Sequence, residues 1–219
     1  MQSLASIHDR NRTRVPAGLL GLVLLASVNV CEAAANPFSA AFVETFREAC
    51  VPERLSYEGT VGHARALGWV AVEPSSHPEF AKVMEHSAKG LEEAKADGLE
   101  LSFQQVSLVR KVESRDLHLI VSFTGSEFLD QIGCYLYDFA ATAPLDAVAV
   151  GQMLGIAAPA QSMETAEITS HVWGPPPSMP RTLDTYLTYI PAGSPHVEQT
   201  GFDGVVLKFS TSAPDEAGQ

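Results

Sequence analysis

The side chains that could perform nucleophilic catalysis gather near the middle of the sequence. His118 lies between Asp116 and the hydroxyls of Ser122, Thr124 and Ser126. Such residues form a triad only when the fold gives them the right geometry, and FTGSEF lacks the second glycine of a nucleophile elbow. His118 also alternates out of the apolar positions around it, which predicts a solvated sheet face. No catalytic residue is therefore assigned.

The histidines do not have the spacing of a metal site. Neither H-x-x-x-H nor H-E-x-x-H, the spacings typical of zinc sites on helices, occurs in this chain. After residue 35 the histidines are His63, His77, His86, His118, His171 and His196. We expect no metal and no cofactor, and leave open only a site assembled across strands from His171 and His196.

Two of the three cysteines predict a disulfide. If the protein is exported, the even count left by Cys50 and Cys134 favours a bond between them, and only one pairing is available. If it is not exported, two free buried thiols are the alternative. Each cysteine falls on an apolar face, Cys50 of a helix and Cys134 of a strand.

The third cysteine, Cys31, belongs to a segment that resembles a secretory signal. A basic start is followed by an apolar run from Val15 to Val30 and by Ala33-Ala34-Ala35, which predicts cleavage near Ala35. Lipid attachment at Cys31 would need a small residue before it, whereas Val30 is β-branched. The apolar run is shorter than the roughly 20 residues that span a bilayer, so no permanent membrane anchor is expected.

An aromatic strand face offers the best candidate for binding. Tyr135, Tyr137 and Phe139 alternate opposite Cys134. Either a helix covers this face as a second packed layer, or it lines a cleft for a small apolar ligand or a partner strand.

The elements that must position these residues are read from hydrophobic periodicity. Phe38, Phe42, Phe46 and Cys50 share one stripe of a helix that opens at Asn36-Pro37. Leu101 and Phe103 fall on odd positions but Val106 and Leu108 on even ones, so a bulge is expected near Gln104-Gln105. The other expected helices span 60–67, 78–96 and 144–154, and the expected strands are VSLVRKV, LHLIVSF, IGCYLYDF, EITSHVW, TLDTYLTYI and DGVVLKFS.

The charge of the chain argues against a polyanionic partner. Its formal net charge is −12, and it becomes −13 without residues 1–35, which hold three arginines, Asp9 and Glu32. Nucleic acid requires basic clusters, as does an anionic membrane surface. We expect neither.

Four stretches, AFVETFREAC, ARALGW, GCYLYDF and LDAVAVGQMLG, resemble a group of small uncharacterised envelope proteins of Gram-negative bacteria. The resemblance implies export and a cysteine pair, and it transfers no catalytic residue.

Together these patterns predict a signal peptide at 1–35, a single α+β domain at 36–212 and a disordered tail at 213–219. The domain should hold a mostly antiparallel sheet of about five to six strands, with N-terminal helices and one mid-chain helix packed on it. We expect a periplasmic or secreted, non-enzymatic accessory protein that binds a small apolar ligand or a protein partner. A hydrolase with a site assembled from distant residues and a structural envelope component are the alternatives.

Overall fold

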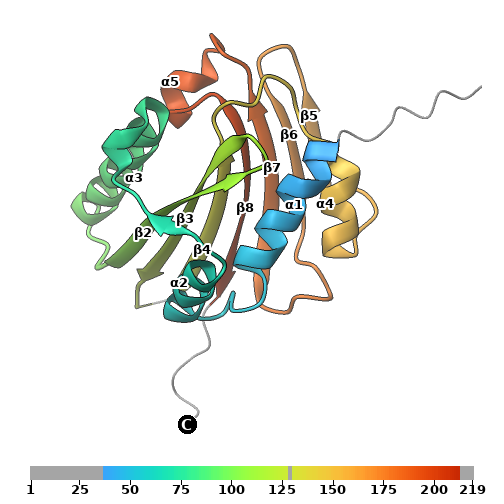
Figure 1. Cartoon of the computed structure of the whole chain (residues 1–219). Helices are drawn as coiled ribbons and strands as arrows, with labels where there is room; N and C mark the ends of the chain where they lie inside the picture. Colours follow the sequence, from blue (N-terminus) through green and yellow to red (C-terminus); the bar gives the residue numbers. More distant parts are fainter. Residues whose placement is uncertain (1–36, 128–129, 213–219) are drawn as a thin grey trace, which may run out of the picture. The chain divides into compact units, whose positions relative to one another are not determined.

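The described part of the chain, residues 37–127 and 130–212 of a computed structural model, contains both helices and strands (Figure 1). All of it belongs to one compact unit. The expected signal peptide and tail lie outside the described residues. In chain order the elements are α1 (Pro37–Cys50), α2 (Tyr57–Ala66), β1 (Val70–Ala71), the 3-10 helix η1 (Pro74–Ser76), α3 (Pro78–Ala96), β2 (Ser102–Val112), β3 (Arg115–Gly125), β4 (Gln131–Asp138), α4 (Ala147–Leu154), β5 (Gln161–Glu164), β6 (Thr169–Trp173), β7 (Thr182–Ile190), α5 (His196–Thr200) and β8 (Gly204–Ser212).

The strands form a single antiparallel sheet, which confirms the fold class. Within the described residues the sheet has eight strands in the order β1-β2-β3-β4-β8-β7-β6-β5, so the expected number of five to six is wrong. The two additional strands are the edges: β1 has two residues, and every residue of β5 is exposed. Neither shows the apolar alternation by which a strand is recognised in a sequence.

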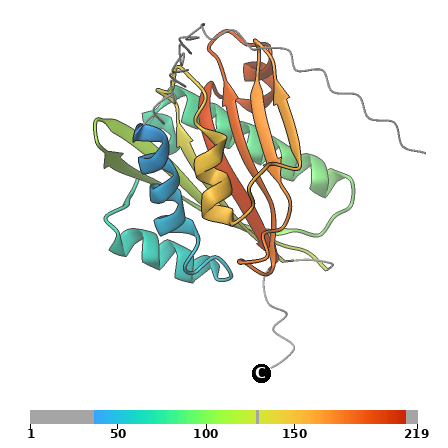
Figure 2. The same cartoon turned by 90° about the vertical axis from the view of Figure 1, so that its right-hand side faces the viewer.

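The sheet is covered on both faces, because successive residues of a strand point to opposite sides. We call one side the α1 face; it carries Leu119, Cys134 and Leu207 and packs under α1, α2 and α4. The other side, the α3 face, carries Ile120, Tyr137 and Val206, and packs against α3 and the segment around α5. Figure 2 shows α1 and α4 in front of the sheet and α3 behind it.

The predicted disulfide is present and joins α1 to the middle of the sheet. Cys50 and Cys134 have an S–S distance of 2.04 Å and a Cα–Cα distance of 5.9 Å, which lies in the usual range for such bonds. Both residues are buried. The bridge therefore lies in the main hydrophobic core rather than at its edge.

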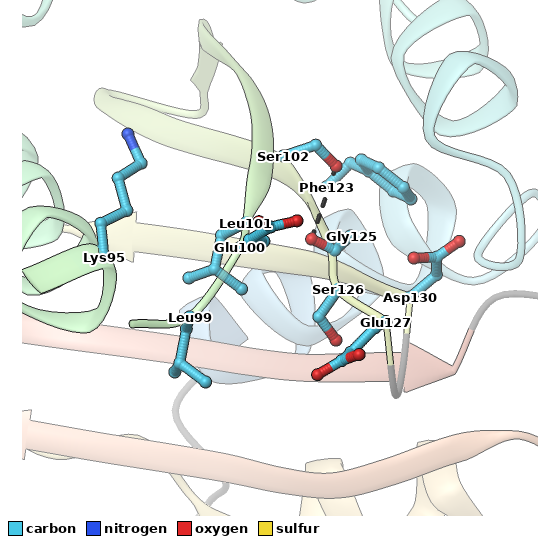
Figure 3. Close-up of a pocket in the computed structure, with 10 residues that line it drawn as sticks. All are labelled: Lys95, Leu99, Glu100, Leu101, Ser102, Phe123, Gly125, Ser126, Glu127 and Asp130. Carbon is cyan, nitrogen blue, oxygen red and sulfur yellow. Dashed lines mark hydrogen bonds between the residues drawn. The ribbon is translucent and has the colours of Figure 1, made fainter. Parts of the chain in front are cut away.

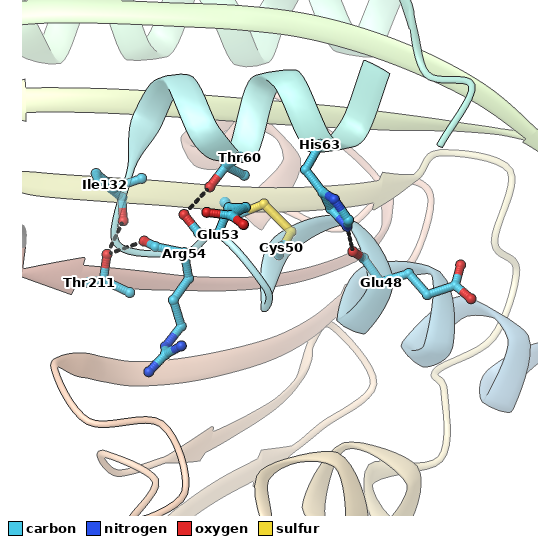
Figure 4. The surroundings of a disulfide bond; sticks show 9 residues. Glu48, Cys50, Glu53, Arg54, Thr60, His63, Ile132 and Thr211 are labelled. Atoms are coloured by element: carbon cyan, nitrogen blue, oxygen red, sulfur yellow. Dashed lines mark hydrogen bonds between the residues drawn. A yellow bond between two sulfur atoms is a disulfide. The ribbon is translucent and has the colours of Figure 1, made fainter. Parts of the chain in front are cut away.

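Hydrogen bonds around the disulfide hold the connection between α1 and α2 (Figure 4). The Thr60 hydroxyl donates to the Glu53 carbonyl at 2.8 Å, and the Thr211 hydroxyl of β8 donates to the Arg54 carbonyl at 2.7 Å. A ring nitrogen of His63 lies 3.0 Å from the Glu48 carbonyl. The Glu48 carbonyl belongs to the last turn of α1, where helical carbonyls lack a partner within the helix, and those of Glu53 and Arg54 belong to the connection itself.

The expected bulge in β2 is absent. Residues Ser102 to Val112 pair one to one with Gly125 to Arg115 of β3, without a shift of register. The apolar residues change phase because the strand is buried by different layers along its length: Leu108 packs on the α1 face, whereas Phe103 lies on the α3 face. A change of covering layer and a bulge produce the same sequence pattern.

No helix within residues 37–127 and 130–212 combines the length and the apolar character needed to cross a bilayer.

Candidate functional site

A groove of about 390 Å³ lies between α3 and strands β2, β3 and β4 on the α3 face. Its walls combine apolar side chains with a few hydroxyl and amide groups, the usual composition of a small-molecule site. The residues that line it include Ser87, Gly90 and Leu91 of α3 and Phe103, Ser122 and Tyr135 of the sheet.

The groove exists because the side chains of α3 become smaller along the helix. Near its N-terminus α3 is anchored by Phe80 and Val83, both buried. Further along, Ser87, Gly90 and Ala94 line the groove instead. A Cβ atom added at Gly90 would meet nothing within 4 Å. Leu91 is the one large side chain in this half of the helix that lines the groove, so the C-terminal half of α3 leaves space above the sheet.

The floor of the groove depends on a glycine beneath a tyrosine. A Cβ atom added at Gly133 would lie 2.5 Å from Cε2 and 2.6 Å from the hydroxyl oxygen of Tyr135. The ring of Tyr135 therefore lies along β4, over Gly133, instead of standing away from the sheet. An aromatic ring covering a strand glycine in this way presents its face to the space above.

The three aromatic residues identified in the sequence have different environments. Tyr137 and Phe139 are buried, whereas Tyr135 is half-buried. Phe139 packs with His77, Phe80 and Phe202, and takes no part in lining the groove. Tyr135 and Tyr137 do line it. The helix covers part of the face and leaves part of it open, so binding at Tyr135 and Tyr137 stays a prediction and Phe139 has a packing role.

His118 is buried, not solvated as its alternation suggested. Its side chain lies under the start of α3, with ring centroids 5.2 Å from His77 and 5.1 Å from both Phe80 and Phe139. Its Nδ1 has no hydrogen-bond partner among the described residues. The error arises because a polar residue opposite an apolar strand face indicates solvent only when no second layer covers it, and here α3 does.

This burial predicts a loss of stability in mild acid. Burial lowers the pKa of His118 from 6.5; His77 lowers it further, while Asp116 and Asp138 act in the opposite direction. Below about pH 6.5 the unfolded chain binds a proton that the folded chain resists, so the free energy of unfolding falls as the pH falls through this range.

In urea unfolding between about pH 7.5 and about pH 5, we expect His118→Phe to lose less stability than the wild type. His86→Phe, on the exposed side of α3, should keep the wild-type dependence. If His118→Phe and the wild type respond equally to acid, the buried imidazole is not the cause.

The structure also brings together a serine, a histidine and a glutamate that the sequence did not connect. The Ser162 hydroxyl lies 2.9 Å from Nδ1 of His171, and Nε2 of His171 lies 3.9 Å from a Glu164 oxygen. Ser162 and His171 are register partners on β5 and β6, a pairing that was missed because β5 itself was not predicted. Ser162 and Glu164 are exposed, and neither hollow described here is lined by the three residues. The contact is a cross-strand hydrogen bond at a sheet edge.

A second, more open hollow of about 690 Å³ adjoins the turn between β3 and β4 (Figure 3). Glu100, Glu127 and Asp130 contribute carboxylates to its rim, and the Ser102 hydroxyl donates to the Gly125 carbonyl at 3.5 Å. No group of three or more His, Cys, Asp or Glu side chains in the described residues is arranged to hold a metal ion. Because this hollow borders residues 128–129, which are not described, no site is assigned to it.

Comparison of the chain with protein-family models, with curated proteins and with solved structures found no match. The groove is therefore the feature from which a function can be inferred.

Proposed function

We propose that this protein is a non-enzymatic binding protein that holds a small, largely apolar ligand in the groove between α3 and strands β2–β4. The observation behind this proposal is the groove itself, where small residues of α3 face apolar and aromatic side chains of the sheet with a few polar ones among them. Leu91, Phe103 and Ile120 would contact the apolar body of the ligand. Ser122 and Thr124 would supply the polar contacts that orient it.

The size of the groove limits the ligand. Its 390 Å³ corresponds to roughly a dozen water molecules at about 30 Å³ each. Displacing that water from apolar walls is the main source of binding free energy that the site offers. A small molecule or one extended apolar chain suits this volume, whereas a folded partner domain does not.

The proposal is tested with N-phenyl-1-naphthylamine, an uncharged probe that fluoresces in apolar surroundings. We expect binding to the wild type and at least about ten-fold weaker binding to Gly90→Leu, because the new side chain fills the space beside α3. The helix itself should tolerate leucine better than glycine.

Gly62→Leu is the matched control. Gly62 is an exposed helical glycine of α2, and a Cβ atom there also meets nothing within 4 Å. It should bind the probe as the wild type does. Equal binding by Gly90→Leu and Gly62→Leu would show that the probe does not use the groove.

We further propose that the protein works in the periplasm or is secreted. A buried structural disulfide is rare in the reducing cytosol, and the first 35 residues have the pattern of a secretory signal. Intact-mass and alkylation analysis of protein from its native host tests this. A full-length product, or two alkylatable thiols under non-reducing conditions, would contradict it.

The alternative of a hydrolase has one observation in its favour, the 2.9 Å contact between Ser162 and His171. We expect no turnover of generic ester, peptide or glycoside substrates. Ester turnover that is abolished in Ser162→Ala and retained in Ser170→Ala would replace the binding proposal with this one.

A further inference from the structure

Lys208 adjoins the groove and has no acidic partner in the part of the chain that the structure describes. It lies on β8, half-buried, with Nζ 5.1 Å from the ring centroid of Tyr186 and 5.9 Å from that of Tyr135. No carboxylate lies within salt-bridge distance of it among the described residues. Burial lowers the pKa of its ammonium group, and no neighbouring charge contributes to that change.

A half-buried cation without a counter-ion is costly, because it loses hydration without gaining a salt bridge. The faces of two tyrosine rings offset only part of this loss. The chain also has a formal net charge of −12, so a lysine in this position does not belong to a generally basic surface. The missing counter-ion favours a role that an anion completes.

The sheet register places this cation directly beyond the groove. Tyr135 pairs with Lys208 across β4 and β8, and Lys208 pairs with Tyr186 across β8 and β7. Paired residues present their side chains side by side on the same face. Since Tyr135 lines the groove, a ligand that extends past Tyr135 along the α3 face reaches Lys208.

We infer that the ligand is an amphipathic carboxylic acid whose apolar chain lies in the groove and whose carboxylate pairs with Nζ of Lys208. This inference rests on the proposed function and specifies the ligand class of the same site. The tail displaces water beneath α3. The head forms a charge-assisted hydrogen bond over the ring of Tyr135, which Gly133 allows to lie flat on the sheet.

The experiment compares decanoic acid with decanol, which has the same chain and no charge, by displacement of N-phenyl-1-naphthylamine. The wild type should bind decanoate at least about ten-fold more tightly than decanol. Lys208→Met should lose this preference while its affinity for decanol is unchanged. Lys208→Arg should restore the preference, and Lys111→Met, an exposed lysine on β2, should leave it intact.

A second readout distinguishes charge pairing from a change in packing. The affinity of the wild type for decanoate should fall as the pH is raised through the lysine's pKa, whereas that of Lys208→Arg should not. Thermal melts verify that each variant is folded.

The outcomes separate this inference from the proposed function. If the wild type binds decanol and decanoate equally and Gly90→Leu binds neither, the groove is a binding site but the carboxylate inference is wrong. If neither decanol nor decanoate binds while the naphthylamine probe still does, the carboxylate inference is also wrong. If none of the three molecules binds, the proposed function is wrong as well.

Discussion

Replacing Cys50 and Cys134 together with alanine should lower the free energy of unfolding by about 4 kcal/mol. The two residues are 84 positions apart, so the bond removes the conformational freedom of a long loop from the unfolded chain. Both sulfur atoms lie in the hydrophobic core, and the substitution also removes their packing contacts. Because small domains are stable by about 5–15 kcal/mol, this loss is a large share of the total.

Guanidinium unfolding of the oxidised wild type and the double variant measures this effect. Dithiothreitol should lower the unfolding midpoint of the wild type toward that of the double variant, because unfolding exposes the buried disulfide to the reductant. It should leave the double variant unchanged. A loss below about 1 kcal/mol would mean that packing alone holds α1 on the sheet, and that the chain-entropy estimate does not apply here.

Replacing Arg115 with methionine should cost about 3–5 kcal/mol, an effect comparable to the loss of the disulfide. Arg115 forms a salt bridge with Asp138, whose side chain is fully buried. Its guanidinium also lies 4.0 Å from the ring centroid of Phe38 at the start of α1. Methionine preserves much of the length of the side chain but leaves the Asp138 carboxylate as an unpaired charge in the core.

Removing the charge of Asp138 instead of that of Arg115 should cost less stability, because the two side chains differ in exposure. The side chain of Arg115 is 32% exposed and can reach water, whereas that of Asp138 is 0% exposed. Asp138→Asn also keeps an oxygen that can accept the Ala140 backbone N–H, now at 3.1 Å. We expect a loss of about 1–2 kcal/mol for Asp138→Asn in urea unfolding.

Arg47→Met serves as the control for charge removal. Arg47 pairs with Glu44 on the exposed surface of α1, where solvent screens the pair and it contributes little to stability. If Arg115→Met lowers the free energy of unfolding no more than Arg47→Met does, an unpaired carboxylate at Asp138 does not destabilise the protein, and the expected desolvation cost is wrong.

The sequence by itself determined the features that depend on local periodicity. The stripe of Phe42, Phe46 and Cys50 predicted α1 and its buried side, and alternation predicted the six longer strands. With two cysteines on apolar faces, the disulfide had only one pairing. Such patterns can be read because the geometry of a helix or strand repeats along the chain, and the buried face repeats with it.

Only the tertiary structure decided what covers each face. The strands β1 and β5 form by pairing with a longer neighbour, and their own residues carry no alternation that would reveal them. His118 is buried because α3 crosses one side of the sheet. Phe103 lies on that same side, whereas Leu108 lies on the side that α1 covers. The groove, and the position of Lys208 beyond it, depend on where the large side chains of α3 end and on which strand lies next to β4. These are contacts between segments far apart in the sequence, and no local repeat encodes them.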